Sequence, residues 1–303
     1  MIKSTEVVVI SGGTGWIGKS LVEQVTKSKF CMPEQIILIS STAKSIEISN
    51  IIYNSLTWEN FEVDSQVNTY FDLAFQTQDK LINFNESNYI KENETIIENS
   101  VEFIKNHKPK SIFLASSGAI YGKNYVSAPK PVSVYGKLKY RQEVEISKVA
   151  SDLSLNLLIS RIFNISGGYI NKFETFAIAQ MIGSATNQHR IEVFADHQVF
   201  RRFSDVNQLI RLILKLLTTG SNCVFDSGGP LIELRELADR IKKIVNPSAE
   251  LHLNEVNVNT SPDDYYSRSD QYEILLKERL GEVSINIDEQ ILKTFDYIKN
   301  LKS

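Results

Sequence analysis

A tyrosine and a lysine four residues apart are well suited to moving a proton. Tyr135 and Lys139 stand in the segment YGKLK, a spacing that places both side chains on one face of a helix. A phenol with its ordinary pKa of about 10 is a poor base at neutral pH, but a neighbouring ammonium favours the phenolate. Tyr135 is the only one of twelve tyrosines with a lysine at this spacing. Because about one such pair is expected by chance, its context must support the assignment.

A group of glycines follows the first strongly apolar segment and could bind phosphate. The run SGGTGWIGKS comes directly after VVVI and contains Gly12, Gly15 and Gly18. The first glycine permits a sharp turn, the second lets a pyrophosphate approach the backbone, and the third lets a helix pack closely. Free N–H groups at the helix start, at Trp16 and Ile17, would face the phosphates. The spacing, G-x-x-G-x-x-G, predicts a dinucleotide-binding turn; the alternative is a tight strand–helix turn without a ligand.

The residues after the second predicted strand bear on the identity of the dinucleotide. An Asp or Glu at this point usually binds the free ribose 2′-hydroxyl of NAD. Here the strand is followed by Ser40, Ser41 and, a little further on, Lys44, with no acid among the residues from 40 to 44. Hydroxyl and ammonium groups can donate to a 2′-phosphate, so the pattern favours NADP, with NAD as the alternative. For Lys44 the competing interpretation is a solvated loop cation.

Composition excludes several classes of function. The 303 residues, 42% hydrophobic and 23% charged, are typical of a globular protein with one large domain or two lobes. A net charge of −3 with scattered basic residues argues against nucleic acid or a membrane surface as partner. No apolar segment approaches the ~18 residues that span a bilayer. Two distant cysteines and four histidines lack metal-ligand spacing, so we expect no metal and a reducing, cytoplasmic setting.

Alternating strand-like and helical segments must position these residues. The expected strands are 6–11, 35–40, 68–74, 111–116 and 156–162, and the expected helices are 19–28, 91–106 and 135–150. The nearly continuous apolar strands predict an α/β fold with a doubly wound parallel sheet of the Rossmann type, covered on both faces. After about residue 165 the alternation weakens. We therefore expect a dinucleotide-binding domain over 1–165, with a returning segment near 200–220, and a smaller α+β substrate lobe over 166–303.

Several segments, in this order, resemble one family. They are the glycine turn, ENETIIENS, SSGAIYG, YGKLK, RIFNISGG, VFADHQVFRRFSDV and FDSGGPLIELRELADRI. Together they resemble the extended short-chain dehydrogenases/reductases, the NAD(P)-dependent epimerase/dehydratase group, which acts largely on sugar nucleotides. The resemblance covers most of the chain and implies a nucleotide sugar as the substrate. It also implies a homodimer that pairs helices 91–106 and 135–150 of each subunit.

The resemblance also assigns catalytic and cofactor roles by position. It makes Tyr135 the acid/base, Lys139 its partner and Ser117 the hydroxyl that orients the substrate. Asn93 matches the helix asparagine that supports the lysine, although the usual glycine and threonine do not follow it. Ala74 would lie against the cofactor. In such a site hydride passes between the substrate carbon and the nicotinamide while the tyrosine handles the proton.

Three further residues are implied to contact the substrate. Arg201 would reach the nucleotide diphosphate, and Arg268 lies in a late segment that resembles a loop closing over the nucleotide. Asn164 follows a predicted strand where family members contact the substrate, and a turn cap is the equal alternative.

The same comparison with the family narrows the reaction. Dehydratases of this group carry an Asp-Glu pair where this chain has Gly118 and Ala119, so dehydration is disfavoured. The absence of an acid after the second strand favours a reductase of a keto-sugar nucleotide that uses free NADPH. An epimerase with a retained cofactor is the alternative. A carbonyl reductase without a nucleotide substrate, and a non-catalytic dinucleotide-binding sensor, also remain open.

Overall fold

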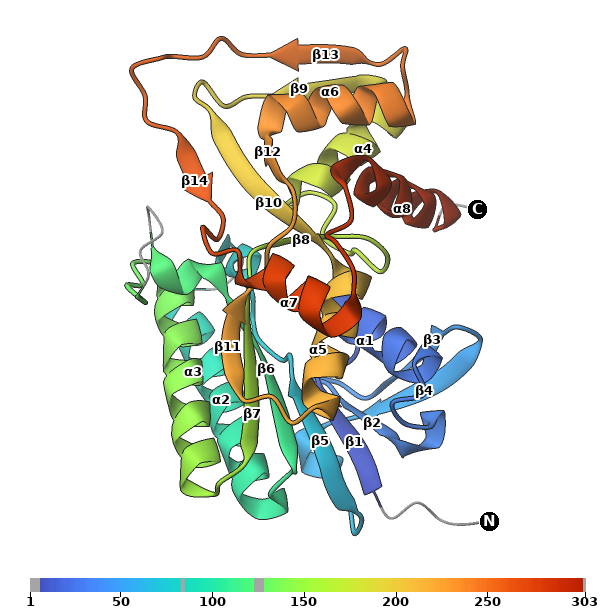
Figure 1. Ribbon diagram of the computed structural model, residues 1–303, viewed down its shortest axis with the longest axis vertical. Coiled ribbons are helices and arrows are strands. Elements are labelled where there is room, and N and C mark those ends of the chain that lie inside the picture. The colour runs from blue at the N-terminus through green and yellow to red at the C-terminus, as the bar shows by residue number, and fades with distance from the viewer. Residues whose placement is uncertain (1–5, 83–84, 123–127, 302–303) are drawn as a thin grey trace. The chain divides into compact units, whose positions relative to one another are not determined.

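The computed structural model describes residues 6–82, 85–122 and 128–301, which divide into two compact units. Unit 1 is built from described residues within Met1–Gly122, Ala128–Arg161 and Ile210–Phe225. Unit 2 is built from those within Ile162–Leu209 and Asp226–Ser303. Each unit has its own sheet and its own helices (Figure 1).

Unit 1 contains an eight-stranded sheet in the order β11-β7-β6-β5-β1-β2-β4-β3. The strands are β1 (Glu6–Ser11), β2 (Ile36–Ile39), β3 (Lys44–Ile48), β4 (Ile51–Leu56), β5 (Gln66–Asp72), β6 (Ser111–Ser117), β7 (Asn156–Ile162) and β11 (Cys223–Asp226). β1 is parallel to β2 and β5, β2 is parallel to β4, and β5 is parallel to β6, whereas β3 is antiparallel to β4. The carboxyl ends of β1, β5 and β6 therefore share one edge of the sheet.

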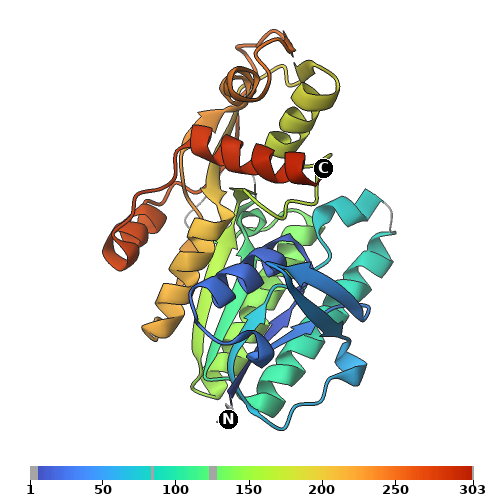
Figure 2. The ribbon, with the colours of Figure 1, turned by 90° about the vertical axis from the view of Figure 1, so that its right-hand side faces the viewer.

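Helices cover both faces of this sheet. Figures 1 and 2 show α1 (Trp16–Lys27) and α5 (Val206–Thr218) on one face, and α2 (Glu86–His107) and α3 (Val134–Asp152) on the other. Short 3₁₀ helices η1 (Pro33–Gln35), η2 (Trp58–Asn60), η3 (Gln78–Ile82) and η4 (Gly118–Tyr121) complete the connections. The core on the α2–α3 face is apolar and fully buried at Val9, Ile104, Leu114 and Ile146. The predicted doubly wound α/β fold is confirmed.

The predicted elements differ from the structure between residues 40 and 66. No strand or helix was expected there, whereas Lys44 begins β3 of a hairpin. Ile48 pairs with Ile51, and the two turn residues, Ser49 and Asn50, both have positive φ, at 52° and 63°. Such a turn matches the twist of the strands that it joins. The Ser-Asn pair between alternating apolar residues is the feature of the sequence that indicates this hairpin.

Unit 2 combines short strands with four helices. One sheet contains β8 (Asn164–Ser166), β10 (Val199–Asp205), β12 (Leu231–Glu233) and β14 (Asp263–Tyr265), and a second pairs β9 (Arg190–Val193) with β13 (Glu250–Leu253). The helices are α4 (Ala177–Asn187), α6 (Leu234–Val245), α7 (Gln271–Leu280) and α8 (Ile287–Asn300). Helices α4, α6 and α8 pack against one another. The assignment of substrate binding to this part of the chain stays a prediction.

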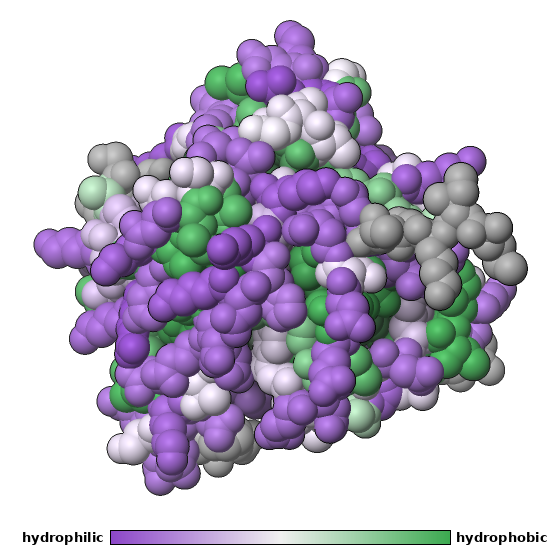
Figure 3. Space-filling view, turned by 90° about the horizontal axis from the view of Figure 1, so that it is seen from below, coloured by the Kyte–Doolittle hydropathy of each residue, from purple (hydrophilic) through white to green (hydrophobic). Residues whose placement is uncertain are grey.

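The described surface and helices bear on the expectations about membranes and metals. Seen from below, the surface is mainly hydrophilic, with separate apolar patches (Figure 3). Among the helices of the described ranges, none has the length and apolar character that a bilayer crossing requires. Within the same ranges no group of three or more His, Cys, Asp or Glu side chains is arranged to hold a metal ion.

The β3–β4 turn gives a stability prediction. Replacing Ser49 with glycine removes the steric cost of positive φ, and we expect the free energy of unfolding to rise by roughly 0.5 kcal/mol. Urea denaturation followed by circular dichroism measures the change. The matched control is Ser45→Gly in extended β3, which should lower the free energy of unfolding. A loss of stability in Ser49→Gly would show that the turn conformation is wrong.

Candidate active site

The glycine turn is shaped by close contacts between backbones. Gly12 has a φ of 71°, and its N–H donates to the carbonyl oxygen of Ile39 at 2.8 Å. A Cβ at Gly12 would lie 2.8 Å from the backbone nitrogen of Ala74, and one at Gly18 would lie 2.4 Å from the carbonyl oxygen of Gly12. These glycines therefore hold β1, α1 and the segment after β5 together. A Cβ at Gly15 would meet only the carbonyl oxygen of Gly12, at 3.3 Å, so this side of the turn is open.

The start of α1 has the features of an anion-binding helix end. Gly15 is its N-cap and supplies no capping side chain, and the first turn contains no acidic residue. The N–H groups and the positive end of the helix dipole are therefore suited to phosphate. Trp16 is 6% exposed and packs into the core at the helix start, while Ile17 is partly exposed. These residues fit the pyrophosphate of a dinucleotide, and their contacts with it stay predictions.

The residues proposed to select NADP lie around the end of β2. The hydroxyl Oγ of Ser40 lies 2.7 Å from both the carbonyl oxygen of Thr42 and the hydroxyl of Ser55. Ser41 is exposed, and so is the side chain of Lys44. The backbone N–H of Lys44 donates to the hydroxyl of Ser55 at 3.1 Å, which ties the start of β3 to β4. Lys44 is therefore the first residue of an edge strand and does not lie in a loop.

Lys139 is buried, and its ammonium contacts a carbonyl oxygen, an amide oxygen and an aromatic ring. Its side chain is on α3, and the residue is 4% exposed. The ammonium Nζ donates to the carbonyl oxygen of Ala115 at 2.8 Å and to Oε1 of Gln142 at 3.0 Å. It also lies 4.0 Å from the centre of the Phe75 ring, a cation–π contact. Burial lowers the pKa of Lys139 to about 8, and the negative charges of Asp72 and Glu143 oppose this effect.

Tyr135 and Ser117 are brought to the same region by the packing of α3 on η4. The hydroxyl of Ser117 caps η4 by accepting from the N–H of Ala119 at 3.2 Å. A Cβ at Gly136 would lie 2.4 Å from the carbonyl oxygen of Ala119, so this contact between α3 and η4 requires a glycine. Tyr135 precedes that glycine, and its ring meets the ring of Phe75 edge-on, at 5.7 Å between centres.

Sequence reasoning missed Gly136 and Phe75. Gly136 stands between Tyr135 and Lys139 in YGKLK, and a glycine inside a predicted helix is the signal that could have found it. Phe75 directly follows Ala74, and no pattern in the sequence points to its place beside both site residues. The backbone N–H of Ala74 donates to the hydroxyl of Ser11 at 3.4 Å, which holds this segment against β1.

Asn93 is fully buried on α2 and holds the segment after β5. Its Oδ1 accepts from the N–H of Gln76 at 2.8 Å, and its Nδ2 donates to the carbonyl oxygen of Tyr89 at 3.1 Å. Lys139, in contrast, donates directly to Ala115 and Gln142. The support that Asn93 was expected to give Lys139 stays a prediction.

A buried ion pair lies beside the site. The carboxylate of Glu143 on α3 accepts from the guanidinium of Arg161 on β7 at 2.9 and 3.1 Å, and also from the hydroxyl of Ser116. Arg161 donates in addition to the phenol oxygen of Tyr121 at 2.7 Å. The charge of Glu143 is therefore already matched by a guanidinium. These contacts join α3, β6, η4 and β7 around the carboxyl end of the sheet.

The three residues expected to contact the substrate gather around β14 in unit 2. The guanidinium of Arg201 on β10 is paired with the carboxylate of Asp263 at 2.8 Å and lies 5.7 Å from the centre of the Tyr265 ring. Arg268 is paired with Asp264 at 3.1 Å. The amide Nδ2 of Asn164 lies 3.4 Å from the carbonyl oxygen of Tyr265. The structure thus brings these residues to one strand, while their contacts with a substrate stay predictions.

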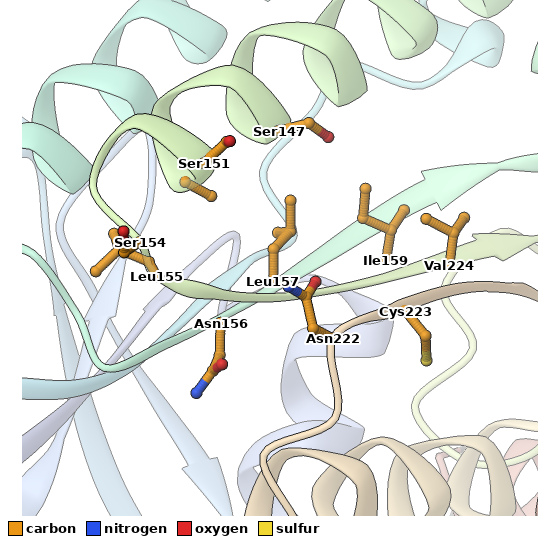
Figure 4. Close-up of a pocket in the computed structure, with 11 residues that line it drawn as sticks. Ser147, Ser151, Ser154, Leu155, Asn156, Leu157, Ile159, Asn222, Cys223 and Val224 are labelled. Carbon is orange, nitrogen blue, oxygen red and sulfur yellow. The ribbon is translucent and has the colours of Figure 1, made fainter.

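A separate pocket of about 530 Å³ lies at the other end of α3. In Figure 4, Ser147 and Ser151 on α3 face Leu157 and Ile159 of β7, while Asn156 and Cys223 point away from the helix. Because Tyr135 and Lys139 stand at the beginning of α3, this pocket is distinct from the candidate active site.

A glycine turn after β1, with a buried lysine one helical turn after a tyrosine at the carboxyl edge of a doubly wound sheet, defines a class of dinucleotide-dependent enzymes. Comparison with known proteins gives the family. The sequence model of the "NAD dependent epimerase/dehydratase family" matches residues 8–225. The chain belongs to this family, and like its members it is an enzyme.

Similar proteins were found at low sequence identity. UDP-glucuronic acid decarboxylase 3 of Arabidopsis thaliana is 23% identical over 274 residues, which cover 85% of this chain and 78% of the relative. Among solved structures, a Thermotoga maritima UDP-glucose 4-epimerase with UDP-glucose has a TM-score of 0.78 at 22% identity, covering 98% of this chain and 99% of that one. A Bacillus cereus UDP-glucuronic acid 4-epimerase with UDP-glucuronic acid and NAD has a TM-score of 0.77 at 17% identity, with 98% and 99% coverage.

The buried lysine gives a prediction for stability against pH. Its folded-state pKa of about 8 lies below the ordinary value of 10.5, so the unfolded chain binds more protons between these values. The free energy of unfolding should therefore rise with pH in this window. Compared with Lys139→Met, the wild type should gain roughly 2 kcal/mol between pH 7 and pH 10 in urea denaturation. A difference between the two proteins that does not change with pH would contradict the lowered pKa.

Proposed function

We propose that the protein moves a hydride between a nicotinamide cofactor and a carbinol or carbonyl carbon of a nucleotide-activated sugar, with Tyr135 as acid/base. The observation that carries the proposal is the buried ammonium of Lys139, one helical turn from Tyr135. A buried cation costs free energy unless its charge is used or compensated. Here it is suited to stabilise a phenolate at neutral pH.

The residues have complementary tasks in this reaction. In the oxidising direction the phenolate oxygen of Tyr135 accepts the proton of the substrate hydroxyl, and in the reducing direction the phenol returns it. The hydroxyl of Ser117 donates a hydrogen bond to the same substrate oxygen and orients it. Lys139 keeps its proton and stabilises the phenolate. When bound, the nicotinamide supplies or accepts the hydride.

A sugar nucleotide is supported by unit 2 and by the relatives. Arg201 and Arg268 provide guanidinium groups near β14 that suit a diphosphate. Both are held by acids, Asp263 and Asp264, so binding would require the diphosphate to compete with or join these pairs. The relatives and solved structures described above are named for UDP-sugars. UDP-sugars are therefore the first compounds to test.

Net reduction of a keto-sugar nucleotide with NADPH is the outcome that we propose first. Its support is the end of β2, where the exposed Ser41 and Lys44 can donate, Ser40 lies beside them, and residues 40 to 44 include no acid for a ribose 2′-hydroxyl. An epimerase with retained NAD is the second candidate. It is favoured by the family description and by the solved 4-epimerase structures that contain NAD.

We also propose a homodimer formed through α2 and α3. The support is the exposed apolar surface of α3, where Tyr140 is 38% and Val144 is 51% exposed. These two residues lie one helical turn apart on the same face of the helix.

Removing the phenol oxygen tests the role of Tyr135. We expect Tyr135→Phe to lower kcat by about 10²–10⁴-fold, because the acid/base group is lost while the ring remains. Cofactor binding, measured by titration of NADPH fluorescence, should persist. Tyr140→Phe, which removes a hydroxyl from an exposed tyrosine of the same helix, is the control and should keep wild-type kcat. Turnover by Tyr135→Phe at the wild-type rate would refute the assignment.

Product mass separates the two outcomes. Native protein is incubated with UDP-sugars or keto-sugar nucleotides and deuterated NADPH, and the products are measured by mass spectrometry. A reductase should give a product carrying one deuterium from the cofactor and consume NADPH. An epimerase should give a product of unchanged mass and carry a tightly bound cofactor from purification. Absence of nucleotide-sugar binding to the wild type would reject the proposed substrate class.

A further inference from the structure

A buried carboxylate at the end of β5 extends the candidate active site inward. Asp72 is 0% exposed. Its Oδ1 accepts from the hydroxyl of Ser11 at 2.9 Å, and its Oδ2 accepts from Nε2 of Gln142 at 3.0 Å. The other end of the same amide, Oε1 of Gln142, accepts from the ammonium of Lys139 at 3.0 Å. One glutamine therefore bridges a buried acid and the buried lysine.

The orientation of this bridge is fixed by chemistry. An ammonium can only donate, so the amide oxygen of Gln142 must face Lys139. The amide nitrogen then faces Asp72, and an ionised carboxylate can only accept. The positive and negative charges polarise the amide in the same direction, which strengthens both hydrogen bonds. A neutral lysine or a protonated Asp72 would weaken this arrangement.

The other charged groups near Lys139 do not replace Asp72. Glu143, from the same helix, is held by the guanidinium of Arg161 and by the hydroxyl of Ser116. The ammonium of Lys139 donates to the carbonyl of Ala115 on β6 and lies over the ring of Phe75 in the segment after β5. Both of these groups are neutral. The side chains that donate to Asp72, among them Ser11 and Gln142, are neutral, and within the described residues Asp72 has no salt bridge.

The titratable groups that face Asp72 and Lys139 are few. Tyr70 lies two residues before Asp72 on β5, and burial and the charge of Asp72 raise its pKa. The hydroxyl of Tyr70 is bonded to Ser100 on α2 at 2.9 Å. Tyr135 lies one turn before Lys139 on α3. Of the residues that the structure describes, Glu143 is the other carboxylate whose charge acts on Lys139.

We infer that Asp72 and Gln142 are positioning residues that keep the buried Lys139 protonated and fixed in place one helical turn from Tyr135. The chain of bonds runs from Ser11, the residue directly before the glycine turn, through Asp72 and Gln142 to Lys139. It therefore connects the end of strand β1 to α3, the helix that carries Tyr135 and Lys139. This inference rests on the proposed function for its catalytic meaning, although the bond network does not depend on the identity of the substrate.

The electrostatics agree with this geometry. Burial lowers the pKa of Lys139, and the charge of Asp72 opposes this effect. Burial raises the pKa of Asp72, and the charge of Lys139 and the side chains of Ser11, Ser100 and Gln142 oppose the rise. Without the charge of Asp72, the lysine would lose its proton at lower pH. The phenolate of Tyr135 would then lose the cation that stabilises it.

The decisive measurement is the titration of Lys139 itself in the folded protein without substrate. Protein labelled with ¹³C at lysine Cε is titrated by NMR, and the Lys139 signal is assigned by its loss in Lys139→Met. We expect Asp72→Asn to lower the titration midpoint by about one pH unit or more. Gln142→Met, which breaks the bridge but keeps the charge of Asp72, should lower it by a smaller amount.

A matched control and a second readout separate this role from simple structural support. Asp205→Asn changes another buried aspartate, which caps α5, and should leave the Lys139 midpoint unchanged. In turnover assays, the alkaline limb of kcat/KM should move to lower pH in Asp72→Asn and in Gln142→Met. A loss of stability alone would lower the rate without moving that limb.

The outcomes distinguish this inference from the proposed function. A lowered midpoint in a protein that turns over no nucleotide sugar would support the role of Asp72 and reject the proposed substrate. Turnover with an unchanged Lys139 midpoint in Asp72→Asn would overturn the inference alone. If Asp72→Asn does not fold, Gln142→Met decides, and a midpoint equal to that of the wild type would overturn the inference.

Discussion

Burial of the Lys139 ammonium is the constraint on which the candidate site depends. A cation removed from water needs acceptors and a counter-charge, and each of them must come from a different part of unit 1. Ala115 supplies a carbonyl from β6, Gln142 supplies an amide from α3, and Asp72 supplies the charge from β5. Ala115 and Asp72 lie near the carboxyl ends of the neighbouring strands β6 and β5, so the order of the sheet brings these two together, and the packing of α3 adds Gln142.

Glycines, which have no side chain, set the spacing of the elements around that cation. Gly12 and Gly18 allow β1, α1 and the segment after β5 to touch through their backbones, and Gly136 does the same for α3 and η4. Any Cβ at these points would push the elements apart. The turn that suits a pyrophosphate and the helix that carries Tyr135 are thus both placed by close backbone contacts that only glycine permits.

Much of unit 1 could be predicted because its signals are local. The apolar runs define β1 and β7 at their observed bounds, and the spacing of Tyr135 and Lys139 correctly places both on α3. The β3–β4 hairpin was missed because its strands are mixed and half exposed, so that neither shows a continuous apolar run. Its turn residues, Ser49 and Asn50, lack the glycine that usually marks positive φ.

By itself the sequence determined the doubly wound sheet, the glycine turn and the Tyr–Lys pair, since each follows from the period and type of nearby residues. Only the tertiary structure decided which groups surround the pair. Asp72 and Lys139 are separated by more than sixty residues in the chain, and nothing in the sequence around Asp72 indicates that it lies near the Tyr–Lys pair. Phe75 and Gln142 are likewise defined by contacts across strands and helices. Such contacts depend on strand order and close packing, which no single segment encodes.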